Sequence, residues 1–198
     1  MQTKIISGPV FVDEALFGLG LSFGLTSHMD CNAAFRKSPA YHALTERSKK
    51  LAHMQGGHNK FLETIGITLD ITAARYWWSQ FDTYRVGITK QSESTMHTIT
   101  KEPFTNDSFE CPMFDSMLTL LNELRERGEF EWLKAHLPEA YLQRRIVSTN
   151  LRVLQNIYNQ RKNHRLTEWH VFFNEIRNAL AASPYEDLAV NYIFGEEF

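Results

Sequence analysis

The segment from Phe61 to Ile71 constrains the fold more than any other part of this sequence. Its apolar positions, spaced two residues apart, are Ile65, Ile67, Leu69 and Ile71. The positions between them are polar or small: Thr64, Gly66, Thr68 and Asp70. Alternation with a period of two residues is typical of a β-strand with one buried face. The sequence therefore predicts a strand in a sheet that packs on a core through one side.

Helical patterns surround this strand. Pro39 to Met54 has apolar residues near one face and charged residues opposite, and Gly56-Gly57 ends the pattern. Further helices are predicted over Ala73–Phe81, Met113–Arg127, Pro138–Arg161 and Thr167–Ala182. Val86 to Thr89 is predicted to be irregular or strand-like, and Pro103 to Pro112 a loop. The predicted fold class is α+β, a small mixed or antiparallel sheet with several helices at one end.

Length and composition indicate one domain that spans residues 1–198. A formal net charge of -2 gives no reason to expect a nucleic-acid partner, and no apolar run approaches the roughly 18 residues that cross a bilayer. Cys31 and Cys111 are far apart, so neither a disulfide framework nor a metal site is indicated. We therefore expect a cytoplasmic protein with reduced thiols.

Short enzyme motifs give no assignment. Gly18, Gly20 and Gly24 superficially resemble a dinucleotide-binding turn, but the third glycine comes one position late and no strand is predicted before them. The sequence also lacks Glu-x-x-His, His-Glu-x-x-His and Gly-x-x-x-x-Gly-Lys. Any site must therefore be read from dispersed polar residues.

Two polar stretches allow a functional and a structural interpretation. His58 follows Gly56-Gly57 and is either held at a turn in a site or simply exposed. The run Thr89–Thr95 is rich in hydroxyls and has cationic residues near it: Arg75, Arg85, Lys90 and His97. Such a run either binds an anion or is a solvated loop.

A third polar group falls in the predicted helix that ends at Arg161. Asn150, Arg152, Asn156 and Arg161 lie within about three helical turns of one another. Asparagine is a poor helix former, so several of them in one helix have a cost in stability. A polar ligand that contacts the helix would account for this cost, and an exposed helix end is the alternative.

Together these parts resemble the flavin-dependent thymidylate synthases (ThyX) in both order and spacing. The shared order is a Gly-His element, a strand, an aromatic-rich helix, a polar substrate loop and a late Asn-x-Arg-x-x-x-Asn-x-x-x-x-Arg. Here the late element runs from Asn150 to Arg161, and Leu137-Pro138 precedes it where the family also has Leu-Pro. The resemblance covers roughly His58 to Ile176, with weaker similarity over Asp13–Phe23. The Tyr-Trp-Trp-x-x-Phe-Asp-Thr-Tyr stretch is similar to viral members and implies a phage origin.

The resemblance implies roles for individual residues. The residues expected to bind the cofactor FAD are His58, Glu63, Arg85, Asn150, Arg152 and Asn156. Those expected to bind the substrate deoxyuridylate (dUMP) are Gln80, Ser94, His97, Lys134 and Arg161. Arg161 and Arg85 are expected to be catalytic, because cations near the pyrimidine carbonyls stabilise negative charge that develops on the ring.

The chain departs from the family pattern at three places. Thr83-Tyr84-Arg85 stands where the family has Arg-His-Arg, and Ser94-Thr95-Met96-His97 stands where it has Ser-x-Arg. Lys134 replaces an upstream arginine. Lysine is a point charge that does not reproduce the two-pronged contact of arginine with phosphate. Nucleotide binding is therefore expected to be weaker, rearranged or directed at a different pyrimidine.

The activity that the resemblance implies is the reductive methylation of dUMP to dTMP. Methylenetetrahydrofolate donates the one-carbon unit, NADPH reduces the flavin, and the sites form between subunits of a homotetramer. Two alternatives stay open. One is a related flavin enzyme that adds a hydroxymethyl group, and the other is a catalytically silent nucleotide-binding or interaction protein on the same fold. The location expected for a phage enzyme is the host cytoplasm.

Overall fold

The computed structural model describes residues 1–54 and 56–195. Within these residues the sheet has four strands in the order β1-β2-β4-β3, and all neighbours are antiparallel. The strands are β1 (Gln2–Val10), β2 (Gly66–Ala74), β3 (Thr89–Ser92) and β4 (Leu142–Asn150). The predicted α+β class with a small antiparallel sheet is confirmed.

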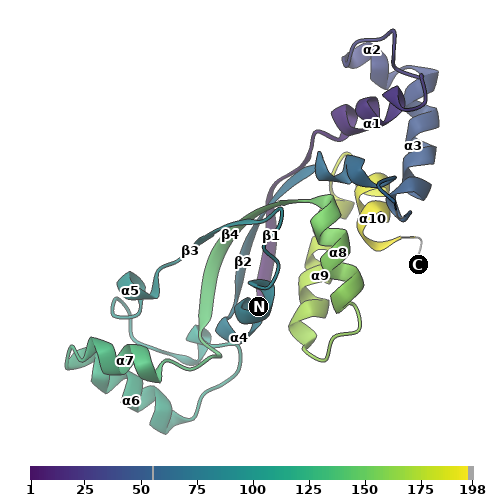
Figure 1. Cartoon of the computed structure of the whole chain (residues 1–198). Helices are drawn as coiled ribbons and strands as arrows, with labels where there is room; N and C mark the ends of the chain where they lie inside the picture. Colours follow the sequence, from purple (N-terminus) through teal and green to yellow (C-terminus); the bar gives the residue numbers. More distant parts are fainter. Residues whose placement is uncertain (55, 196–198) are drawn as a thin grey trace.

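Helices lie beyond both ends of the sheet as well as along one side of it, whereas the sequence predicted them at one end (Figure 1). The N-terminal group comprises α1 (Val12–Leu21), α2 (Ala33–Arg36), α3 (Pro39–Ala52) and the short 3-10 helix η1 (Lys60–Glu63). The group at the opposite end comprises α5 (Thr95–Thr98), η2 (Asn106–Ser108), α6 (Asp115–Glu126) and α7 (Phe130–His136). The helices beside the sheet are α4 (Arg75–Phe81), α8 (Leu151–Arg161), α9 (Thr167–Ala181) and α10 (Glu186–Phe194).

Strand β2 confirms the alternation that the sequence predicts. Its inward side chains, all buried, are Ile67, Leu69, Ile71 and Ala73. The residues between them, such as Thr68 and Asp70, are half-buried on the other face. Burying a large aliphatic side chain is worth about 1.5–3 kcal/mol, so a one-residue slip of this strand would be strongly unfavourable.

Strand β4 corrects one prediction. A single helix was predicted over Pro138–Arg161, but Leu142 to Asn150 forms a strand between β2 and β3, and the helix begins at Leu151. Arg144 pairs with Asp70 at 2.6 and 2.8 Å, and Arg145 with Asp82 at 3.0 Å. These carboxylates come from β2 and α4, and a periodic pattern does not register long-range partners.

The glycines near the N-terminus serve helix packing. Gly18 and Gly20 lie within α1, and a Cβ on Gly20 would come within 2.6 Å of Thr26 and 2.9 Å of Leu44. The missing side chain therefore allows α1 to approach α3 closely. This packing accounts for Gly20 without a dinucleotide-binding turn.

Other local predictions are met in part. β3 begins at Thr89 and continues past the predicted 86–89 segment. The predicted loop 103–112 contains only the short η2. Neither β1 nor the helices α7 and α10 were predicted. β1 is an edge strand that contains Pro9 and the exposed Ile6, so its pattern is weak.

Buried apolar residues form two separate clusters. The larger cluster lies between the sheet, the N-terminal helices and α8–α10. The smaller cluster lies among α5, α6, α7 and the loops beside them, and its members are Ile99, Phe104, Phe109, Leu121, Leu124, Leu133 and Leu137. The single domain inferred from length stays a prediction.

Three further observations concern chemistry outside the core. Cys31 and Cys111 are both exposed and free. Among residues 1–54 and 56–195, no three His, Cys, Asp or Glu side chains gather in a way that could hold a metal ion. In the same residues, no helix is long and apolar enough to span a membrane.

Candidate functional site

A cavity of about 550 Å³ opens where the loop after α4 meets the start of α8. Of the six predicted cofactor ligands, the structure brings five to its wall: Glu63, Arg85, Asn150, Arg152 and Asn156. The loop supplies one guanidinium, and α8 supplies the other together with two amides. The N-terminal end of a helix carries partial positive charge, so this wall is electropositive and rich in hydrogen-bond donors.

Asn150 has a structural task at this wall. It is the N-cap of α8, and its side-chain oxygen accepts a hydrogen bond of 3.0 Å from the backbone N–H of Val153. An asparagine cap is worth roughly 1 kcal/mol. Helix capping therefore accounts for the presence of Asn150 in this segment without a ligand. The Nδ2 group stays available for a ligand.

Gly87 fixes the loop against α8. Its backbone has φ +72°, and a Cβ there would lie 2.8 Å from Val153 and 3.5 Å from the Asn150 amide. The Gly87 carbonyl also accepts a hydrogen bond of 2.8 Å from the Thr149 hydroxyl. A side chain at Gly87 would therefore push the loop, and Arg85 with it, away from the cavity wall.

The two guanidiniums and the second amide at this wall are available to a ligand. Arg152 donates to the Gln155 side chain at 2.9 Å, and Asn156 accepts from Gln160 at 3.2 Å. Arg85 is exposed and forms neither an ion pair nor a side-chain hydrogen bond within the described residues. Among the described residues no carboxylate forms an ion pair with either arginine, although Glu63 lines the same cavity, so both guanidiniums can bind an anion.

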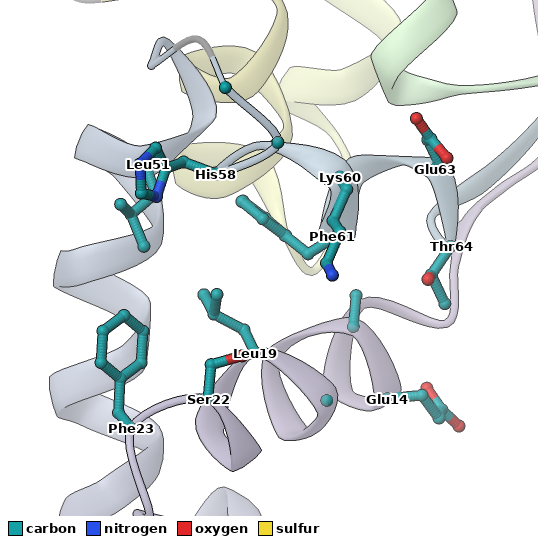
Figure 2. Close-up of a pocket in the computed structure, with 14 residues that line it drawn as sticks. Glu14, Leu19, Ser22, Phe23, Leu51, His58, Lys60, Phe61, Glu63 and Thr64 are labelled. Carbon is teal, nitrogen blue, oxygen red and sulfur yellow. The ribbon is translucent and has the colours of Figure 1, made fainter.

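His58, the sixth predicted cofactor ligand, lies in a neighbouring cavity of about 580 Å³. This cavity lies between α1, α3 and η1, and Figure 2 shows Lys60 pointing into it toward α1. Glu63 lines both cavities and in Figure 2 points away from α1. The two cavities are therefore adjacent, with Glu63 between them.

Gln80 and Arg161, both predicted to bind the nucleotide, contact each other. Arg161 donates to the Gln80 side-chain oxygen at 3.4 Å, and its Nε donates to the Tyr84 hydroxyl at 2.8 Å. Both residues are half-buried. Tyr84, which contacts Arg161, also lines the α8 cavity together with Asn156. Gln80 and Arg161 therefore lie beside the wall formed by the predicted cofactor ligands.

Trp169 completes this group and was not singled out from the sequence. Its indole Nε1 donates to the Gln80 side-chain oxygen at 3.0 Å. The Arg161 guanidinium carbon lies 5.1 Å from the Trp169 ring centroid and 5.5 Å from that of Tyr84. A buried tryptophan needs a partner for its N–H, and this requirement was the one signal in the sequence that pointed to such a contact.

The remaining predicted substrate residues lie elsewhere. Ser94 is the N-cap of α5, and His97 lies within that helix, exposed. Lys134 lies on α7 and donates a hydrogen bond to the Thr95 hydroxyl. α5 and α7 lie beyond the end of β4 opposite to α8 (Figure 1). One chain therefore brings Ser94, His97 and Lys134 together but does not bring them to Arg161.

α4 begins near the start of β4, because Ala74 pairs with Leu142 and Arg75 donates to the Leu137 carbonyl. Gln80 lies near the other end of α4, so the length of that helix, roughly 10 Å at 1.5 Å per residue, separates the pair of Gln80 and Arg161 from this end of β4. Lys134, near the same end of β4, has a lowered pKa because burial disfavours its charge and Arg75 repels it. A bound anion would stabilise the charged form of the Lys134 amine and oppose both of these effects.

The fold matches solved structures over almost its whole length. Two crystal structures of ThyX from Helicobacter pylori, both complexed with FAD and dUMP, align with TM-scores of 0.73 and 0.70. The alignments cover 98% of this chain and 100% and 99% of those chains, at 17% and 16% sequence identity. At this identity the likeness shows the fold, which is that of the flavin-dependent thymidylate synthases. No protein of curated function matches the sequence.

The sequence itself decides the family. Residues 30–183 match the model of the thymidylate synthase complementing proteins, which is more than half of the chain. The chain belongs to this family. The match includes every predicted site residue, from His58 to Arg161. Membership in the thymidylate synthase complementing proteins agrees with the resemblance found in the sequence motifs.

Proposed function

We propose that this protein is a flavin-dependent thymidylate synthase that converts dUMP to dTMP. FAD is the cofactor, methylenetetrahydrofolate the one-carbon donor and NADPH the reductant. One observation carries the proposal: five of six expected cofactor ligands line one cavity, and the expected nucleotide residues Gln80 and Arg161 lie in contact beside it. Family membership and the FAD and dUMP of the two structural relatives support it.

The donor set of the α8 cavity fits a flavin dinucleotide. A guanidinium binds two oxygens of one phosphate through two parallel hydrogen bonds. Arg85 and Arg152 supply two guanidiniums, one for each phosphate of a diphosphate. The amides of Asn150 and Asn156 offer both donors and acceptors, which suits the edge of an isoalloxazine ring. Bound there, the flavin supplies the one-carbon transfer and hydride chemistry. His58 and Glu63 extend the cavity wall on the η1 side.

The chain's own contribution to the reaction is charge and orientation. Arg161 places a permanent cation against Gln80, where the pyrimidine ring is expected. Negative charge that develops on the ring oxygens would be stabilised there, and Arg85 would add a second cation. A half-buried guanidinium held by Tyr84 needs little reorganisation when that charge appears, which is the condition for effective electrostatic catalysis.

The separation of the two substrate groups supports a site shared between subunits. Ser94, His97 and Lys134 lie on or next to α5 and α7, whereas Arg161 is the last residue of α8 and contacts Gln80 on α4. In the proposed homotetramer, the cationic α5–α7 end of one subunit meets the α8 cavity of another and binds the nucleotide phosphate. Lys134 and His97 stand in for the arginines of the family pattern, so phosphate affinity would be modest. The cytoplasm, of the host for a phage protein, is the proposed location.

The first test is spectroscopic. The visible absorbance of the purified protein, with and without added FAD, should show bound flavin, and dUMP should perturb that spectrum. Release of tritium from dUMP labelled at C5 then measures turnover, and product analysis separates a methyl from a hydroxymethyl product. A colourless protein that does not take up FAD would contradict the proposal and favour a silent nucleotide-binding or interaction protein.

A complementation experiment tests the shared site. Arg161→Ala and Lys134→Ala should each lose most tritium release when assayed alone. Mixed and reassembled, the two variants should recover part of the activity, because some sites would combine the intact Lys134 of one subunit with the intact Arg161 of another. Mixing Arg161→Ala with Gln80→Ala, whose defects lie in the same group, is the matched control and should recover none. Recovery in neither mixture would mean that each site is built from one chain.

A further inference from the structure

The orientation of the Gln80 amide is fixed by two groups that can only donate. The indole N–H of Trp169 and the guanidinium of Arg161 have no acceptor, and both contact the same Gln80 side-chain atom, at 3.0 and 3.4 Å. That atom must therefore be the carbonyl oxygen. The usual ambiguity between the oxygen and nitrogen of a glutamine side chain does not arise here.

With its oxygen occupied, Gln80 presents its nitrogen to the site. The Gln80 Nε2 group has no hydrogen-bond partner within the described residues, and the residue is half-buried. We propose that Trp169 is a positioning residue that orients Gln80 as a hydrogen-bond donor and thereby makes the site prefer uracil to cytosine. The inference rests on the proposed function, because it assumes that a pyrimidine nucleotide binds beside Gln80.

The chemistry of the two bases explains the preference. Uracil carries a carbonyl at C4, which accepts a hydrogen bond, whereas cytosine carries an amino group there, which donates. An outward Gln80 Nε2 group donates a hydrogen bond to the C4 carbonyl of uracil. With cytosine, the same group would face the C4 amino group, which is also a donor. A site whose polar group stays unpaired against the wrong base rejects that base more strongly than contact area alone would.

Trp169 is suited to this role because close packing holds its ring in place. It is fully buried, and its ring packs against three neighbours from α4 and α9: Trp77 at 4.7 Å, Phe172 at 6.0 Å and Phe81 at 6.2 Å between ring centroids. An amide hydrogen-bonded to a tightly packed indole would keep its orientation without substrate. The specificity of the site would thus be built into the core of the free protein.

The core also provides a matched control. Trp77 is as buried as Trp169 and stacks on the same rings, but its indole nitrogen has no hydrogen-bond partner. Trp169→Phe and Trp77→Phe therefore remove similar volume from one cluster, and only the first releases the Gln80 oxygen. We expect Trp169→Phe to lower the ratio of dCMP to dUMP dissociation constants by about tenfold, the value of one well-formed hydrogen bond. Trp77→Phe should leave the ratio unchanged.

Gln80→Glu gives a second and opposite test. A carboxylate accepts from Trp169 and Arg161 as the amide oxygen does, but its other oxygen is an acceptor as well. The variant should therefore bind dCMP more tightly than dUMP and reverse the order of the wild type. The ratio of the two constants cancels any general repulsion between the new charge and the nucleotide phosphate.

Both constants would be measured by titrating dUMP and dCMP against the flavin absorbance of the intact protein. A lower ratio in Trp169→Phe alone, with reversal in Gln80→Glu, supports the inference. Equal ratios in Trp169→Phe, Trp77→Phe and wild type would overturn it, even if turnover fell. A wild-type protein that binds flavin but neither nucleotide would instead remove the proposed function, and the inference with it.

Discussion

The two ends of the molecule hold their site residues in different ways. Beside α8 and α9, Arg161 and Gln80 are in contact with each other and with the buried Trp169, which belongs to the larger apolar cluster. At the α5–α7 end, Ser94 and His97 are exposed on a short helix above the smaller cluster. The first end is organised within one chain, whereas the second presents its polar groups outward.

Under the proposed function, this difference corresponds to a division of labour. The groups proposed to discriminate a base contact the large core, where each aromatic ring has several close-packed neighbours. The groups proposed to attract a phosphate, Lys134 and His97, need charge more than exact orientation, so the smaller cluster suffices for them. Four substitutions test this contrast.

The largest effect is expected in the larger cluster. Phe172→Ala removes a fully buried ring that packs on Trp77 and Trp169, at 5.4 and 6.0 Å between centroids. The free energy of unfolding should fall by about 3–5 kcal/mol, because a large cavity is left in a tightly packed core. Denaturant unfolding measures this. Phe114→Ala, at a side chain that is 85% exposed, is the control and should change little.

The second prediction concerns the smaller cluster. Leu121→Ala, at a fully buried position on α6, should cost about 2–4 kcal/mol. We expect the loss to be local: amide hydrogen exchange should accelerate over α6 and α7 while α8 and α9 keep their protection. Equal acceleration in α9 would show that the two clusters unfold as one unit, and the contrast between the two ends would then hold for their sites but not for their stability.

The same contrast separates what the sequence could predict from what it could not. β2 was predicted because its alternation is local and its inward residues are uniformly apolar. The late spacing from Asn150 to Arg161 was recognised from residues that share one short segment. In contrast, β4 was mistaken for a helix because the partners of Arg144 and Arg145 are distant in sequence.

Trp169 was missed for a related reason. Its position on α9 predicts only that it is a core residue, and its hydrogen bond to Gln80 joins residues 89 positions apart. Gln80 and Arg161 were both predicted, but their contact depends on how α4 and α8 pack. Likewise, nothing in the motif reveals that Lys134 contacts Thr95 on α5 and that Arg161 contacts Gln80 on α4. Sequence thus predicted members of a site, and only packing determined which of them meet.

The third prediction tests the well-ordered end. Arg161→Ala should weaken dUMP binding by about 1.5–3 kcal/mol, or roughly 10- to 150-fold, because a charged donor to the pyrimidine is lost and Gln80 keeps only one restraint. Nucleotide titration of the flavin absorbance measures this, and thermal unfolding should change little. Arg165→Ala, at an exposed arginine in the connection between α8 and α9, is the matched control. Unchanged dUMP affinity in Arg161→Ala would remove Arg161 from the site.

The smallest effect is expected at Asp82, which joins α4 to β3 and β4 between the two ends. Burial raises its pKa, but hydrogen bonds from Lys90 and Arg145 outweigh burial, so the pKa lies below its ordinary value. A carboxyl with a lowered folded-state pKa stabilises the protein above its unfolded pKa of about 4, and this stabilisation is lost as the pH falls through the folded-state pKa.

Asp82→Asn should therefore lower the free energy of unfolding at neutral pH by less than about 1 kcal/mol, because the Asp82 side chain is 42% exposed and solvent screens the pair. The difference from wild type should shrink as the pH falls below about 4, where the wild-type carboxyl also becomes neutral. Urea unfolding at several pH values measures this, with the exposed Asp107→Asn as control. A difference that persists at low pH would mean that Asp82 joins the two ends through packing and not through its charge.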